Sequence, residues 1–166
     1  MHVAVLDTAI HDREGFRCGV EPLDRYIRER AASDVKKAVA ICYVLFSDDD
    51  PSAIRGFYTL SSFSIELSGL PDTVRKRLPK YPVVPATLIG RLAIGKEHRG
   101  KGFGEWLLFD ALRRALQTSH VIGSAAIVID AKDERGMAFY EKYGFQSFSA
   151  DRLRLFMPMG TVAQLF

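Results

Sequence analysis

The stretch ATLIGRLAIGKEHRGKGFGEWLLFDALRRALQ, residues 86–117, decides the fold class of this chain. Its first part, residues 86–95, is mostly apolar and predicts a long β-strand. Beyond the glycines, apolar side chains recur at helical spacing, which predicts a helix with one buried stripe. The stripe consists of Leu107, Leu108, Ala111, Leu112, Ala115 and Leu116. A strand, a glycine-rich turn and a helix therefore follow one another along the chain.

The residues that follow extend this α/β pattern. Residues 124–131, SAAIVIDA, are apolar and β-branched without alternation, which predicts a central strand buried on both faces. If this strand runs parallel to the first one, the helix between them is a right-handed crossover. Asp133 is placed to cap a second helix, ERGMAFYEKY, which ends at Gly144. The segments GFQSF and RLRLFM predict two last strands, which complete a mixed sheet.

The N-terminal half adds further elements. Residues 22–33 open with a proline and have apolar side chains at helical spacing, which predicts an amphipathic helix. Residues 39–46 predict a buried strand, and residues 55–67 predict its hairpin partner. Residues 70–85 hold four prolines around a short helical stretch, which carries the most basic cluster of the chain.

Length and composition are those of one globular domain covering residues 1–166. With 48% hydrophobic residues and a formal net charge of +3, the chain is not of the disordered class. No segment approaches the roughly 18 apolar residues of a membrane span, and no signal-peptide pattern opens the sequence. We therefore expect a soluble, cytoplasmic protein. Cys18 and Cys42 form no CxxC pair, so neither a disulfide framework nor a metal site is expected.

The run Arg99-Gly100-Lys101-Gly102-Phe103-Gly104 is the main candidate for a binding site. Glycines allow the backbone to turn tightly and to approach a ligand. The unpaired N–H groups of the helix's first turn attract an anion, so a phosphate or pyrophosphate fits this loop. A purely structural turn is the alternative interpretation. The loop is neither a Walker loop, since no GK[ST] closes it, nor a Rossmann GxGxxG, since Glu105 replaces the third glycine.

A second motif, FYEKYGF at residues 139–145, follows the buried strand by most of one helix. The two motifs together make most of the chain resemble the GNAT superfamily of N-acetyltransferases. The family's [QR]xxGx[GA] loop is matched by Arg99, Gly102 and Gly104, and its Y-x-x-x-GF element by Tyr140, Gly144 and Phe145. The resemblance implies a mixed central β-sheet flanked by helices, with the pyrophosphate of acetyl-CoA on the loop.

Four further segments resemble the acetyltransferase toxins of bacterial toxin–antitoxin systems. They are FRCGVEPLDRYI, GFYTLS, LPKYPVVPATLIGRLAI and VIDAKDERGMAFYEKYGF, which begin at residues 16, 56, 78 and 128. Those enzymes acetylate the amino acid carried by aminoacyl-tRNA, which blocks translation. The resemblance also implies a ribbon-helix-helix antitoxin and a homodimer.

The family pattern assigns roles to individual residues. Tyr140 is the expected catalytic acid, because a phenol with a pKa of about 10 can protonate a leaving thiolate, and Tyr143 is the rival phenol. Asp133 departs from the pattern, because many members have Asn there for a pantetheine contact. Backbone N–H groups of residues 92–94 are expected to bind the acetyl and pantetheine carbonyls, with that of Ile94 at the oxyanion. The cofactor-binding set is Leu92, Ala93, Ile94, Arg99, Gly100, Lys101, Gly102, Phe103, Gly104 and Asp133.

The acceptor implied by the resemblance fits the residues at hand. An α-amino group has a pKa of about 7.7 to 8.0 against about 10.4 for lysine, so it attacks near neutral pH without a strong general base. The strand GRLAI offers no carboxylate for such a base. A protein-lysine acceptor would require one, and Glu66 and Asp133 are the candidates.

A tRNA acceptor also requires cations for its phosphates. The expected nucleic-acid-binding residues are Arg75, Lys76, Arg77 and Lys80, extended by Lys36, Lys37, Arg91 and Arg28. A solvated charged face is the competing interpretation of this cluster. Four aromatic residues, Phe57, Tyr58, Phe63 and Tyr81, line an amino-acid pocket or fill the core, and the core is expected for most of them.

Two other functions remain open at this point. The first is an acetyltransferase whose acceptor is a small-molecule amine or a protein N-terminus. The second is a binding module that uses acetyl-CoA as an effector without catalysis. Tyr140 argues against the second of these.

Overall fold

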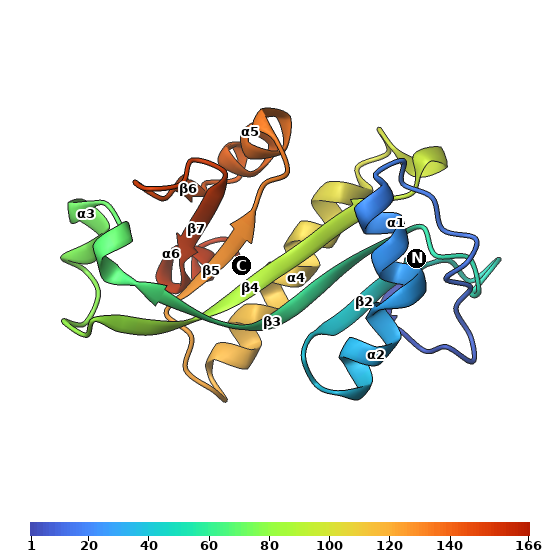
Figure 1. Cartoon of the computed structure of the whole chain (residues 1–166), viewed down its shortest axis with the longest axis horizontal. Helices are drawn as coiled ribbons and strands as arrows, with labels where there is room; N and C mark the ends of the chain where they lie inside the picture. Colours follow the sequence, from blue (N-terminus) through green and yellow to red (C-terminus); the bar gives the residue numbers. More distant parts are fainter. The chain divides into compact units, whose positions relative to one another are not determined.

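A computed structural model describes residues 1–166, whose strands form one seven-stranded sheet in the order β1-β2-β3-β4-β5-β7-β6 (Figure 1). The strands are β1 His2–Val5, β2 Ile41–Phe46, β3 Gly56–Glu66, β4 Val83–Ile94, β5 Ala126–Asp130, β6 Gln146–Ser147 and β7 Arg154–Pro158. The helices are α1 Glu21–Glu29, α2 Ala31–Lys36, α3 Asp72–Arg75, α4 Phe103–Ser119, α5 Glu134–Lys142 and α6 Met159–Ala163, with short 3₁₀ turns at Leu67–Gly69 and Lys96–His98. No helix combines the length and the apolar character that a membrane crossing requires.

The chain folds into two compact units. The first unit comprises Met1–Ser61 and Gly90–Ala111, and the second comprises Ser62–Ile89 and Leu112–Phe166. Strands β3 and β4 and helix α4 each contribute residues to both units. The glycine loop lies in the first unit, whereas α3 and α5 lie in the second.

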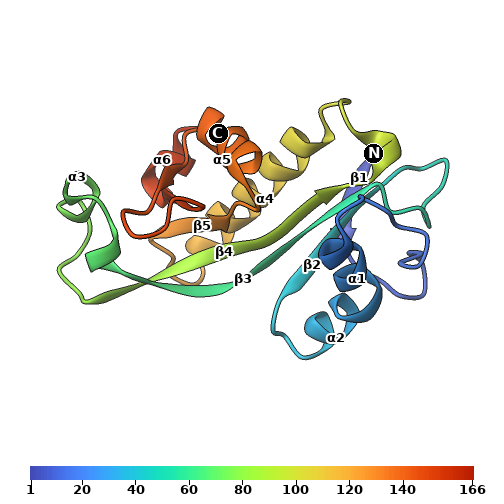
Figure 2. The same ribbon diagram turned by 45° about the horizontal axis from the view of Figure 1, so that its top comes forward.

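In the first unit, β2 pairs antiparallel with β1 on one side and with β3 on the other. Helices α1 and α2 lie beside β2 in both Figure 1 and Figure 2. Their apolar faces join the strands in one core, which includes the fully buried Ile27, Val44 and Phe57. Burial of this amphipathic face, rather than helix propensity, stabilises helices as short as these.

In the second unit, β5 pairs antiparallel with β7, from Ala126 opposite Pro158 to Asp130 opposite Arg154. Helix α6 packs against both strands, and α3 occupies the turn that joins β3 to β4 (Figure 1). Ile65, Val128 and Phe156 are buried in the core of this unit.

The central prediction, a strand, a glycine turn, a helix and a parallel strand, is confirmed. Strand β4 pairs parallel with β5, with Thr87 opposite Ile127 and Ile89 opposite Ile129. Asp133 caps α5 by accepting a hydrogen bond of 2.9 Å from the N–H of Gly136. Gly144 has a φ of +100°, as the left-handed residue after a helix requires.

Three predictions of local structure were wrong. The single helix over residues 22–33 is two helices, α1 and α2, which are separated at Arg30, where φ is −120°. Strand β4 begins at Val83, before Pro85, rather than at residue 86. The expected strand GFQSF contributes only Gln146–Ser147 to the sheet.

Candidate active site

The glycine loop presents a continuous row of unpaired backbone donors. The φ angles of Gly100 and Gly102 are +74° and +79°, in the left-handed region that favours glycine. None of the N–H groups from Gly100 to Glu105 donates to a protein acceptor, and the first backbone bond of the helix comes from Trp106 to Gly102. A Cβ at either glycine would meet no atom within 4 Å, so the space above the loop is open. This row, together with the positive end of the α4 dipole, forms a cradle for an anion such as a pyrophosphate.

The C-terminal part of β4 offers a second set of backbone groups. The β4–β5 ladder covers Thr87–Ile89, so the predicted acyl-binding residues Leu92, Ala93 and Ile94 lie beyond it. Ala93 points into the core of the first unit, whereas its two neighbours are half-buried. The N–H of Gly95 donates to the carbonyl of Arg55 at 2.8 Å, which fixes the end of the strand before the glycine loop begins.

Arg99 has a role that its motif did not predict. Its guanidinium donates to the backbone carbonyl of Cys18 rather than projecting freely toward the loop's open side. A second hydrogen bond holds the segment that contains Cys18, because the N–H of Lys96 donates to the carbonyl of Arg17 at 2.9 Å. The side chain of Arg99 therefore fastens the segment before α1 to the segment that leads into the anion cradle.

Asp24 holds the other side of the same segment and was missed by the sequence analysis. Its carboxylate, which is 3% exposed, accepts hydrogen bonds from the N–H groups of Cys18 at 2.7 Å and Gly19 at 3.3 Å. Burial alone would raise the pKa of this carboxyl, but the hydrogen bonds from the two backbone groups outweigh it and leave the pKa lowered. Asp24 and Arg99 together form the Cys18 clamp, by which name we refer to these two side chains and the peptide group they hold.

Tyr140 lies on α5 in an aromatic setting. Its ring makes edge contacts with Phe139 and Phe145, at centroid distances of 5.2 and 5.9 Å. Burial raises the pKa of its phenol well above the ordinary value, although the residue keeps 8% exposure. No protein group forms a hydrogen bond with the phenol oxygen, so the hydroxyl is available to a substrate.

Asp133 and the rival Tyr143 lie at the two ends of the same helix. The Oδ1 atom of Asp133 is engaged by the helix cap, which gives this carboxylate a structural task that Asn would also perform. Tyr143 is the residue after the last turn of α5, with Lys142 5.2 Å from its ring centroid. Tyr143 also makes an edge contact with Phe139, at 5.2 Å, but it is only half-buried, whereas Tyr140 is buried.

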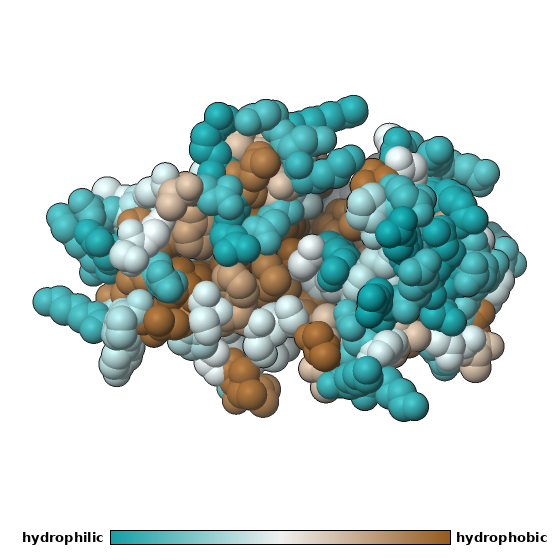
Figure 3. All heavy atoms as spheres, in the orientation of Figure 1, coloured by the Kyte–Doolittle hydropathy of each residue, from teal (hydrophilic) through white to brown (hydrophobic).

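The predicted basic residues fall into two groups. Lys36, Lys37, Lys76, Arg77 and Lys80 are exposed and form no ion pair. The others are already engaged. Arg75 is paired with Asp72, Arg28 lies 3.4 Å from Glu21, and the guanidinium of Arg91 stacks 3.6 Å from the centroid of the Tyr26 ring. Hydrophilic atoms gather over α1 at the right of Figure 3, whereas apolar atoms occupy much of the middle of that face.

The four aromatic residues considered for an amino-acid pocket differ in burial. Phe57 and Tyr58 are fully buried, and Phe63 packs against the core of the second unit. Tyr81 is 66% exposed, so a place in the core is wrong for this residue.

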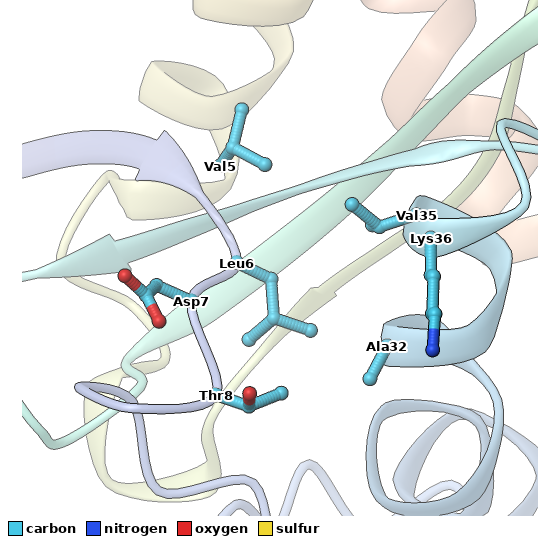
Figure 4. Close-up of a pocket in the computed structure, with 7 residues that line it drawn as sticks. All are labelled: Val5, Leu6, Asp7, Thr8, Ala32, Val35 and Lys36. Carbon is cyan, nitrogen blue, oxygen red and sulfur yellow. The ribbon is translucent and has the colours of Figure 1, made fainter.

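One pocket of about 490 Å³ was not foreseen from the sequence. It lies between the end of β1 and helix α2, with Asp7 and Lys36 on opposite sides (Figure 4). Its walls contain none of the residues expected to bind acetyl-CoA, so it is separate from the anion cradle.

Comparison with known proteins agrees with this geometry. Residues 40–147 match the acetyltransferase (GNAT) domain family, and this range includes β4, the anion cradle and Tyr140. A protein of Mycobacterium tuberculosis (strain ATCC 25618 / H37Rv) described as a tRNA-acetylating toxin is 34% identical over 89% of this chain and 86% of its own length.

A probable toxin TacT of Sinorhizobium fredii (strain NBRC 101917 / NGR234) is 32% identical over 96% of this chain and 92% of its own length. Among solved structures, AtaT complexed with acetyl-methionyl-tRNAfMet superposes with a TM-score of 0.91 and 26% identity, covering 99% of this chain and 98% of that one. The chain therefore belongs to the GNAT family of acetyltransferases.

Proposed function

We propose that this protein is a toxin that transfers the acetyl group of acetyl-CoA to the α-amino group of the amino acid on a charged tRNA, which blocks translation. The observation that carries the proposal is the extent of the likeness to the relatives. It covers nearly the whole chain and includes α1, α2 and α3, which lie outside the anion cradle. A likeness confined to the acetyl-CoA-binding part would leave the acceptor open.

The chain supplies groups for both halves of the reaction. The N–H row of Gly100–Glu105 holds the pyrophosphate of acetyl-CoA, and backbone N–H groups at Leu92, Ala93 and Ile94 bind its carbonyls. Acetyl-CoA contributes the activated thioester. The exposed side chain of Lys101 adds a cation to this row.

Transfer then needs one bond to form and one to break. The neutral amine attacks the thioester carbonyl, the new N–C bond forms and the C–S bond breaks. Tyr140 delivers its proton to the departing sulfur and is restored by the proton that the amine loses. The N–H of Ile94 stabilises the negative charge that develops on the carbonyl oxygen.

The proposal includes an assembly and a location. The protein acts as a homodimer of one GNAT domain per chain, residues 1–166, in the cytoplasm, where charged tRNA is found. A ribbon-helix-helix antitoxin neutralises it. These parts rest on the likeness to the toxin subgroup and are tested by light scattering and by co-expression with the protein encoded next to it.

The enzymatic part is tested by incubating the protein with labelled acetyl-CoA and three acceptors: total charged tRNA, the same tRNA after deacylation, and a mixture of small amines and peptides. Label on charged tRNA alone supports the proposal. Label on amines or peptides but not on charged tRNA would replace the acceptor and keep the acetyltransferase.

A further inference from the structure

We infer that Tyr81 and three exposed cations next to it in sequence form a stacking site for an unpaired base of the RNA. The cations are Lys76, Arg77 and Lys80, and we call the four residues the Tyr81 platform. This inference rests on the proposed function, because it states how the acceptor RNA is recognised. The platform lies entirely within the second unit, on the segment that joins α3 to β4.

The exposure of the Tyr81 ring is the first observation. The side chain is 66% exposed, and its ring packs on no other aromatic ring or cation of the protein. Val83, two residues later, is 47% exposed, so the apolar surface continues beside the ring. An aromatic ring this exposed leaves its apolar face open to a partner.

The backbone under the ring is held in place. Pro82 restricts Tyr81 to extended geometry, because the proline ring collides with a helical residue before it. The N–H of Tyr81 donates to the carbonyl of Pro79 at 2.9 Å, and the carbonyl of Pro82 accepts from Leu67 at 3.2 Å. A ring presented on ordered backbone loses little conformational entropy when it binds a partner.

The three cations of the same segment form no ion pair. Asp72 is paired with Arg75, which leaves Lys76, Arg77 and Lys80 exposed and without a carboxylate partner. Hydrophilic atoms cover the region of α3 in Figure 3. Three unneutralised cations attract a polyanion and disfavour a basic or apolar protein surface.

The combination of ring and cations selects the kind of RNA. Duplex RNA is bound through phosphates and ribose hydroxyls, which require no aromatic ring. Unpaired bases stack on aromatic side chains while nearby cations follow the backbone phosphates. The platform therefore fits a single-stranded segment, such as the 3′ end that carries the amino acid.

Binding of two labelled RNA hairpins, without acetyl-CoA, tests the inference. One hairpin has a single-stranded 3′ overhang and the other is blunt. Tyr81→Leu is expected to weaken binding of the overhang hairpin about 5- to 100-fold and to leave the blunt hairpin unchanged, since stacking acts on unpaired bases. Tyr81→Phe retains the ring and should bind within about 2-fold of wild type. Val121→Ala, at an 86% exposed apolar side chain outside the platform, is the matched control.

The salt dependence of RNA affinity distinguishes the contribution of the cations from that of the Tyr81 ring. Each of Lys76→Gln, Arg77→Gln and Lys80→Gln should lower the slope of log affinity against log salt by about 0.7 to 1. Tyr81→Leu should leave that slope unchanged, because stacking releases no counterions.

Three results would overturn the inference. Tyr81→Leu would bind the overhang hairpin as tightly as wild type, or it would lose both hairpins equally. A change in oligomeric state of Tyr81→Leu, measured by light scattering, would make this surface a contact between proteins and would overturn it as well. Failure of wild type to acetylate charged tRNA is a separate result, which contradicts the proposed function whatever the hairpins show.

Discussion

At Tyr140, the proposed catalytic acid, burial sets the protonation state of the phenol. The surrounding rings of Phe139 and Phe145 exclude water, and burial raises the pKa of the phenol because the charged phenolate is poorly solvated. The side chain therefore carries its proton at every pH near neutrality. In the proposed mechanism a poorly solvated thiolate is more basic than in water, which favours its protonation by a phenol.

Removing the hydroxyl should separate binding from chemistry. Tyr140→Phe keeps the ring and its packing, so acetyl-CoA affinity measured by calorimetry should stay within about 2-fold, while turnover falls about 100-fold or more. Tyr143→Phe is the matched control and should retain most turnover. Equal losses in the two variants would contradict the assignment of Tyr140.

The pH profile of turnover follows from the same side chain. The rate should rise with pH as the acceptor amine loses its proton, with a midpoint below about 8, because the ester bond to tRNA lowers the pKa of the α-amino group. Because the pKa of Tyr140 is raised above about 10, no descending limb from this group is expected below pH of about 10. A bell-shaped profile that falls between pH 8 and 9 would point to a different acid.

Arg99 gives a prediction about positioning rather than ligand contact. Arg99→Gln retains a donor for the carbonyl of Cys18, whereas Arg99→Met does not. Because Arg99→Met loses this hydrogen bond, its affinity for acetyl-CoA should fall about 3- to 10-fold. Arg99→Gln should keep an affinity close to that of wild type. If the side chain instead bound the pyrophosphate by its charge, both variants would lose affinity alike.

At the scale of elements, we propose that the turn between β4 and α4 binds the pyrophosphate because its backbone N–H groups donate to no protein acceptor. A carboxylate placed in this row of N–H groups would occupy the ligand's position. Gly102→Glu should therefore abolish measurable acetyl-CoA binding. The matched control is Gly123→Glu, since Gly123 has no atom within 4 Å of a Cβ and no left-handed φ. Unchanged affinity in Gly102→Glu would remove the pyrophosphate from this turn.

The hydrogen bonds of Asp24, which hold the segment before α1, predict how the free energy of unfolding depends on pH. The pKa of Asp24 is lowered in the folded protein, so its contribution is present above the unfolded pKa of about 4 and is lost as pH falls through the folded value. Asp24→Asn should cost about 1 to 3 kcal/mol at pH 7 in urea unfolding, and its difference from wild type should narrow below pH of about 4. Asp49→Asn, at an exposed carboxylate without a hydrogen-bond partner, is the control and should change stability little. A difference in the free energy of unfolding between Asp24→Asn and wild type that persists at low pH would contradict the role of the Asp24 charge.

Over the whole molecule, the elements with strong local signals were predicted from sequence. The periodic α4, the unbroken apolar β5 and the capped α5 carry their own signatures. Strand β1 and helix α6 were missed, because β1 is short and gains its pairing only from β2. Helix α6 contains Gly160 and forms where Met159 and Val162 are buried by tertiary packing.

The residues of the candidate site show the same difference between local sequence signals and tertiary contacts. The glycine loop and Tyr140 could be proposed from sequence because their motifs have a recognisable spacing, and their roles stay predictions. Asp24 was missed because a carboxylate on an amphipathic helix normally faces water, and only tertiary structure buries it under the Cys18 peptide. The exposure of Tyr81 was missed for the opposite reason, because hydropathy places an aromatic side chain in the core. Arg91 was expected to bind RNA, and its stacking on Tyr26 depends on residues distant in sequence.

The most direct test of the account is the transfer of labelled acetyl from acetyl-CoA to total charged tRNA by wild type and by Tyr140→Phe, with deacylated tRNA as the blank. We expect label on charged tRNA only, with about 100-fold less in the variant. Label on deacylated tRNA, or equal labelling by the two proteins, would contradict the assignment of the α-amino acceptor or of Tyr140, respectively. No label on any tRNA, from a protein that acetylates other amines, would contradict the central claim that charged tRNA is the acceptor.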